Sequence, residues 1–154
     1  MEKFLEYIYD AEKKIRVLDH LVYVTFPLLK NKRILLKSLL ELKLVLVKCI
    51  NSILHYDYIY RRIKLVKDPN INFKTFQEKC SFRYGISKDE LVLISNLFDL
   101  VQKYNQSSME FMRRENIVIL SEDSNIEILT LEKIKEFLFL SKNILKKTKE
   151  GILR

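Results

Sequence analysis

Two residues near the amino terminus are of the types that could together cleave RNA. Arg16 and His20 stand four positions apart, so in a helix they share one face. Arginine can bind a phosphate through two hydrogen bonds, and histidine can move protons near neutral pH. Asp10 and Asp19 are close enough in the sequence to supply carboxylates. The alternative is a polar helix face that carries an ordinary helical pair.

The Arg16–His20 pair resembles the motif of the HEPN family, small all-helical domains that often cleave RNA as dimers. In that family four to six residues separate the arginine from the histidine, usually late in the bundle. Here three residues separate them, in the first predicted helix. The resemblance implies a metal-independent ribonuclease with this catalytic pair, which His20→Ala would inactivate.

A second candidate site combines basic and aromatic residues after position 55. Tyrosine rings stack on unpaired bases, and arginine and lysine neutralise phosphates. Tyr56 and Tyr60 also continue an apolar helical stripe, where tyrosine is often half-buried. The residues that we expect to contact nucleic acid here are Tyr58, Arg61, Arg62, Lys64 and Lys67. Arg61→Glu with Arg62→Glu should then weaken RNA binding with little change in melting temperature.

Two further pairs of basic residues are candidates for phosphate contacts. Arg113 and Arg114 follow a predicted turn of helix, where they would also suit the negative end of the helix dipole. Lys32 and Arg33 stand at the start of a long predicted helix, whose free amides attract anions. Cations are mildly unfavourable for the helix at that end, which favours a role for them in binding a ligand.

The remaining chemistry is sparse, and the sequence predicts neither a metal site nor a cofactor. The chain holds two histidines, two cysteines and two glycines. The HxxxH, CxxC and HExxH spacings of metal sites do not occur, nor do the glycine-rich motifs of phosphate loops. An enzyme is therefore less expected than a binding protein.

Composition and charge indicate one folded domain over residues 1–154, with a formal net charge of +8 and a pI near 9.4. That charge permits binding to nucleic acid, an anionic membrane surface or an acidic partner, although an AT-rich genome alone can produce it. Because charged residues occur in the first turns, we expect no secretory signal. Two isolated cysteines favour a reducing compartment. We expect a cytoplasmic location and no transmembrane segment.

Hydrophobic periodicity predicts an all-α fold, a bundle of about four main helices plus short helices, with a small β-hairpin near residues 116–130. The longest apolar stripe keeps helical register over about eight turns. Its members are Leu35, Leu39, Leu42, Leu46, Cys49, Ile53, Tyr56, Tyr60 and Ile63. The predicted helices span 2–25, 31–67, 73–83, 88–104 and 131–149, with a loop at 68–72 and a short helical turn at 109–114.

Short sequence motifs predict where several of these helices and strands begin and end. Phe26-Pro27 should end the first helix, because the residue before a proline avoids the α region. Ser87 and Glu90 form a capping box at the start of the fourth. Two β-branched runs, 117–120 and 126–129, flank a polar loop and predict the hairpin.

The sequence therefore favours a basic helical binding module that contacts RNA or DNA through these Lys, Arg and Tyr residues. An alternative is an assembly protein without catalytic activity, in which a homodimer or a protein partner covers the hairpin edges and the leucine-rich helices. The HEPN-like ribonuclease is a further alternative.

Overall fold

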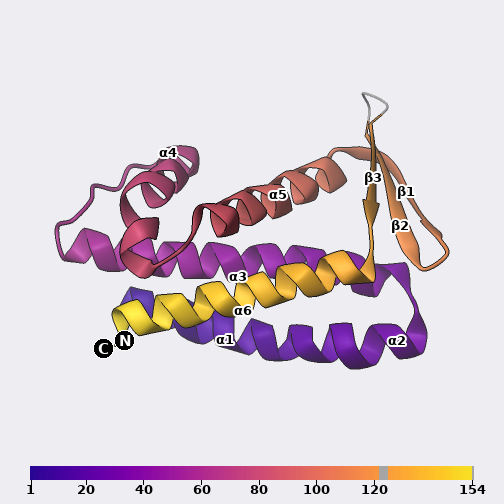
Figure 1. Cartoon of the computed structure of the whole chain (residues 1–154), viewed down its shortest axis with the longest axis horizontal. Helices are drawn as coiled ribbons and strands as arrows, with labels where there is room; N and C mark the ends of the chain where they lie inside the picture. Colours follow the sequence, from indigo (N-terminus) through magenta and orange to yellow (C-terminus); the bar gives the residue numbers. More distant parts are fainter. Residues whose placement is uncertain (122–124, 154) are drawn as a thin grey trace.

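The computed structural model describes residues 1–121 and 125–153, and it is mostly helical with a small antiparallel sheet (Figure 1). Figure 1 shows α3 running the length of the molecule, with α4 near one of its ends and the sheet near the other. The structure bears out the predicted helical character and adds a strand to the predicted hairpin.

The first helical segment runs past the proline at which we expected it to end. α1 spans Lys3–His20, a π-helical turn spans Leu21–Thr25, and α2 adds Phe26–Leu29. Proline removes one backbone hydrogen bond and crowds the carbonyl four residues earlier in a regular helix. The wider π turn directly before α2 leaves room for the Pro27 ring. The end predicted at Phe26-Pro27 is therefore wrong.

The long central helix, α3, spans Lys32–Ile59 and ends eight residues before the predicted Lys67. Its start is as predicted: the Asn31 side chain caps it by accepting a hydrogen bond from the Arg33 amide at 2.9 Å. The stripe residues up to Ile53 are buried, whereas Tyr60 is 57% exposed and Ile63 lies beyond the helix. Burial of this stripe follows from its period, because one face of α3 meets other helices.

The segment after α3 contains a helix where we expected a loop. α4 spans Pro69–Thr75, a π turn spans Phe76–Cys80, and a 3₁₀ turn spans Ser81–Tyr84. Asp68 caps α4 by accepting a hydrogen bond from the Asn70 amide. Pro69 occupies the first helical position, where a backbone N–H would have no partner within the helix, so its missing N–H costs nothing. The predicted loop at 68–72 is therefore wrong. Gly85, in the left-handed conformation with φ 72°, ends the segment as expected.

The two remaining helices follow their caps. α5 spans Lys88–Asn105 and begins with the predicted capping box, in which Ser87 and Glu90 satisfy each other's amides. α6 spans Leu131–Ile152, with the Thr130 side chain accepting from the Lys133 amide at 3.0 Å.

Three antiparallel strands form the sheet in the order β1-β2-β3. β2 spans Asn116–Ser121 and β3 spans Ile126–Leu129, which confirms the predicted hairpin strands; the centre of its loop, 122–124, lies outside the described residues. β1 spans Ser107–Arg113, so the helical turn predicted at 109–114 is wrong. The β1–β2 turn has positive φ at Arg114 and Glu115, 52° and 70°, the conformation of tight hairpins that glycine and asparagine usually occupy.

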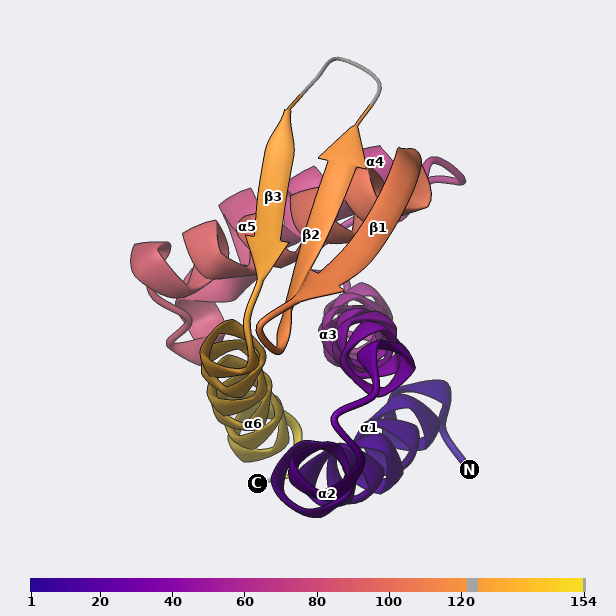
Figure 2. The ribbon, with the colours of Figure 1, turned by 90° about the vertical axis from the view of Figure 1, so that its right-hand side faces the viewer.

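Packing centres on α3. α3 contacts α1 and α6, these two contact each other, and α5 lies across α3 and α6 (Figure 2). The buried side chains form one continuous cluster that includes residues from all these helices. The sheet joins this cluster through one face, where Ile117, Ile119 and Leu129 are buried above α5.

Candidate nucleic-acid interface

α3 ends in a Schellman motif that turns the chain into the predicted basic segment. The Arg61 amide donates to the Tyr58 carbonyl at 3.0 Å, and the Arg62 amide donates to the Asp57 carbonyl at 2.8 Å. Arg61 takes the left-handed position with φ 60°, which glycine usually occupies. The chain therefore reverses at Arg61.

The Asp57 carboxylate, fully buried, holds this turn in place. Arg62 Nη1 donates to Asp57 Oδ1 at 3.1 Å, and Arg83 Nη1 donates to Oδ2 at 2.8 Å. The Tyr84 hydroxyl also donates to Oδ1, at 2.9 Å. Burial and the hydrogen bond to Asp57 raise the pKa of the Cys80 thiol to about 12. A buried carboxylate needs such partners, so Asp57 joins α3 to the 76–84 segment.

Part of the predicted basic-aromatic cluster serves this structural joint. The Arg62 guanidinium lies 5.7 Å from the centroid of the Tyr56 ring and 5.5 Å from that of Tyr60. The two rings lie 4.6 Å apart, and Tyr56 also meets Phe4 of α1 edge-on at 5.1 Å. Arg62 is therefore engaged within the fold, and the Arg61→Glu, Arg62→Glu pair is not the clean binding test that the sequence suggested.

Basic residues of this segment, Arg62 included, line an open cleft of about 470 Å³. Its basic residues are Arg61, Arg62, Lys64 and Lys79, and Ile63 and Ile71 are among its apolar lining residues. None of the lining residues is acidic. Lys79 comes from the π turn after α4, and sequence reasoning missed it because the approach of this turn to the 61–66 segment is a tertiary contact.

Three of these four cations lack a carboxylate partner. Among the described residues, no ion pair involves Arg61, Lys64 or Lys79. The nearby Glu78 pairs with Lys74 at 4.0 Å, and neither lines the cleft. Three positive charges therefore converge here without a paired carboxylate, which is the electrostatic pattern of an anion-binding site.

Two further predicted residues flank the cleft without lining it. Tyr58, in the last turn of α3, is 52% exposed, as the sequence predicted. Lys67 is exposed in the stretch that leads to α4.

The remaining predicted contacts gather at the opposite end of α3. Lys32 begins that helix, about 40 Å from its last residue at 1.5 Å per residue. The Lys32 Nζ lies 3.5 Å from the Glu110 carbonyl of β1, which brings Lys32 and Arg33 to the sheet that carries Arg113 and Arg114. The candidate basic residues therefore form two separate groups and not one patch.

The Arg16–His20 pair lies exposed on α1. The acids that we considered as its partners are engaged elsewhere: Asp19 pairs with Lys142 of α6 at 2.6 Å, and Asp10 with Lys48 of α3 at 3.5 Å. Within the described part of the chain, Arg16 and His20 form no hydrogen bond with each other. The structure therefore places Arg16 and His20 on α1, as their spacing predicts, and gives no further support to a catalytic pair.

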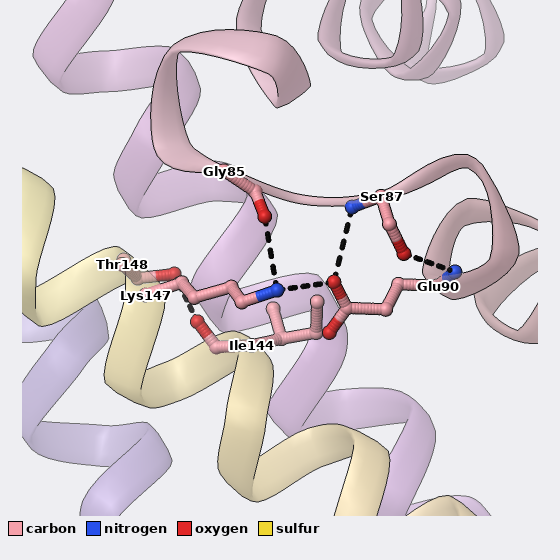
Figure 3. Close-up of polar contacts among 6 residues, drawn as sticks. All are labelled: Gly85, Ser87, Glu90, Ile144, Lys147 and Thr148. Carbon is pink, nitrogen blue, oxygen red and sulfur yellow. Dashed lines mark hydrogen bonds and ion pairs between the residues drawn. The ribbon is translucent and has the colours of Figure 1, made fainter.

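A second polar cluster links α5 to α6 (Figure 3). Lys147 of α6 donates to the Glu90 carboxylate and, at 2.9 Å, to the Gly85 carbonyl, while the same carboxylate accepts from the Ser87 amide at 3.0 Å. Burial by itself raises the pKa of Glu90, but the hydrogen bond from Lys147 and those from Ser87 outweigh it, so the pKa lies below its usual value. This cluster extends the capping box into a tertiary contact.

No protein-family model matches this chain, and no curated protein or solved structure matches it either. Within residues 1–121 and 125–153, no group of three or more His, Cys, Asp and Glu side chains could hold a metal ion. In the same part of the chain, every helix is too short or too polar to cross a membrane.

Proposed function

We propose that the protein binds RNA or DNA at the basic cleft beside the carboxyl end of α3. The observation that carries the proposal is the convergence of Arg61, Arg62, Lys64 and Lys79 on a cleft with no acidic lining residue. The exposed Tyr58 ring lies in the adjoining turn of α3, available to stack on an unpaired base. Phosphate neutralisation supplies affinity, and stacking favours single strands.

The number of cations sets the expected salt dependence. Each phosphate contact to a single strand contributes a slope of about −0.7 to the logarithm of affinity against the logarithm of salt concentration. Three or four contacts give a slope of about −2 to −3, so affinity falls roughly 20- to 50-fold for a fourfold rise in salt. A much steeper slope would mean that the second basic group also contacts the same strand.

The test is fluorescence anisotropy with labelled single-stranded RNA, single-stranded DNA and duplex DNA over a salt series. Lys64→Glu with Lys79→Glu removes the cleft charge without touching Asp57. Lys37→Glu with Lys146→Glu changes the net charge equally at exposed lysines outside the cleft and serves as the matched control. The cleft variant should lose at least tenfold in affinity relative to the control. Equal losses in both variants would refute the cleft as the binding site.

The same samples separate the alternatives that the sequence left open. A homo-oligomeric assembly protein would elute and scatter light as a multimer and bind none of the probes. A HEPN-like ribonuclease would cleave the RNA probe without divalent ions, and His20→Ala would abolish the cleavage.

A further inference from the structure

The outer face of the sheet is apolar and exposed. Strand pairing places Phe111, Val118 and Ile128 side by side on this face, opposite the face that packs on α5. Met109 and Ile126 lie on the same face, and they are 55% and 62% exposed. Figure 2 looks onto this face, with α5 behind the strands. Exposed apolar side chains that share one face indicate an interaction surface.

A second element brings apolar side chains to the same end of the molecule. Leu28 and Leu29 of α2 are 77% and 67% exposed. The next residue, Lys30, pairs with Glu115 of the β1–β2 turn at 2.6 Å, which holds α2 beside the sheet. We call this region the sheet end: the outer sheet face (Met109, Phe111, Val118, Ile126 and Ile128) with Leu28 and Leu29.

Cations without acidic partners accompany these apolar side chains. Arg33, Arg113 and Arg114 are exposed, and none of them forms an ion pair within the described part of the chain. Of the acids in the described part of the sheet and its β1–β2 turn, Glu115 pairs with Lys30 and Glu127 pairs with Lys103. Glu110 lies on the inner face of the sheet. The described sheet end is therefore both apolar and positively charged.

The dimensions of the sheet disfavour a second copy as the main partner. Three strands about 4.8 Å apart and up to seven residues long present roughly 300 Å². A stable protein interface buries about 800 Å² on each partner. A second copy would also bring the same uncompensated arginines, whereas an anionic surface would neutralise them.

We propose that the sheet end binds peripherally to an anionic lipid surface. Phe111, Ile128 and the α2 leucines enter the boundary between headgroups and acyl chains, while Arg33 and Arg113 contact lipid phosphates. This combination of apolar and basic side chains on adjacent elements fits a plane of lipid, which offers both an apolar layer and negative charge. The binding does not depend on the basic cleft, which lies at the other end of α3.

Vesicle co-sedimentation tests the proposal. The protein should pellet with vesicles of mixed phosphatidylcholine and phosphatidylglycerol and stay in the supernatant with phosphatidylcholine alone. Phe111→Thr with Ile128→Thr keeps strand propensity but removes the apolar contact. Arg33→Gln with Arg113→Gln removes the charge. Each variant should lower the partition coefficient about tenfold, with far-UV circular dichroism and the melting temperature confirming that it folds.

Two control variants make the test specific. Phe82→Thr removes the most exposed phenylalanine outside the sheet end, 92% exposed, and Lys64→Gln with Lys79→Gln removes two charges from the basic cleft. Both controls should pellet like the wild type. The proposal is overturned if the wild type stays in the supernatant, or if the controls lose as much binding as the sheet-end variants. A dimer that dissociates in the Phe111→Thr, Ile128→Thr variant, without vesicle binding, would assign the face to a second copy.

Discussion

The ring of Tyr84 occupies the space into which any side chain at position 151 would project. A Cβ atom on Gly151 would lie 2.4 Å from Tyr84 Cδ1 and 2.5 Å from Cε1. The ring cannot withdraw freely, because its hydroxyl donates to the buried carboxylate of Asp57. The last turn of α6 is thus joined through one tyrosine to the carboxyl end of α3.

Gly151→Ala should lower the free energy of unfolding by about 1–3 kcal/mol, the usual cost of overpacking a well-filled site. The loss is expected although alanine favours a helix by about 1 kcal/mol over glycine. Urea unfolding followed by circular dichroism measures it. In a Tyr84→Ala background the same substitution should be neutral or stabilising. A stabilising effect of Gly151→Ala in the wild-type background would show that the ring adjusts without cost.

Arg62→Glu should destabilise the fold by about 2 kcal/mol or more, because it removes a partner of a buried carboxylate and places a second negative charge beside it. Arg61→Glu has no such partner to lose and is the matched control. Thermal unfolding of the two variants side by side measures the difference. Equal melting temperatures would mean that Arg83 and Tyr84 suffice to hold Asp57.

Arg61→Gly should raise the free energy of unfolding by about 0.5 kcal/mol, since glycine adopts the left-handed conformation without strain but loses more chain entropy on folding. It should also weaken nucleic-acid binding, because the cleft loses one cation. The comparison variant is Lys64→Gly, which has no left-handed strain to relieve. A lower stability for Arg61→Gly would show that the arginine side chain contributes packing that offsets its backbone strain.

Glu90 should contribute stability that depends on pH. Its pKa in the folded protein lies below the usual 4.5, so the ionised form is favoured by folding. The contribution is complete above about pH 4.5 and is lost as the pH falls through the lower folded-state pKa. Wild type should therefore exceed Glu90→Gln in free energy of unfolding at neutral pH, with the gap narrowing in acid. Asp89→Asn, at the neighbouring exposed carboxylate, is the comparison. If the difference in free energy of unfolding between wild type and Glu90→Gln does not change with pH, the charge of Glu90 is not the cause of that difference.

Features that depend on neighbours in the sequence were predicted well. The capping box of Ser87 and Glu90 forms as expected, because its donors and acceptors lie three residues apart. The stripe from Leu35 to Ile53 is buried, because period alone places it on one face. The β2 and β3 strands follow from two β-branched runs around a polar loop.

Several boundaries were wrong for identifiable reasons. β1 was missed because its tight turn uses Arg114 and Glu115 where a glycine or asparagine would normally signal a hairpin. The start of α4 carries a local signal, because Asp68 caps the helix and Pro69 follows it, but the same residues are also typical of the predicted loop. The end of α3 has no local sequence signal, because the apolar period of the helix continues past Ile59 to Ile63.

The amino-acid sequence by itself determined the helical character, the main core stripe, the helix caps and the excess of positive charge, because each depends on residues a few positions apart or on composition. Only the tertiary structure decided where α3 stops and which cations meet. Asp57 binds Arg83, which is 26 residues away in the chain, and Lys79 joins Arg61 and Lys64 at the cleft. Helix packing also separates the basic residues into a cleft at one end of α3 and a sheet end at the other. A helical period cannot predict this separation, because it orders residues within one helix but does not place one helix against another.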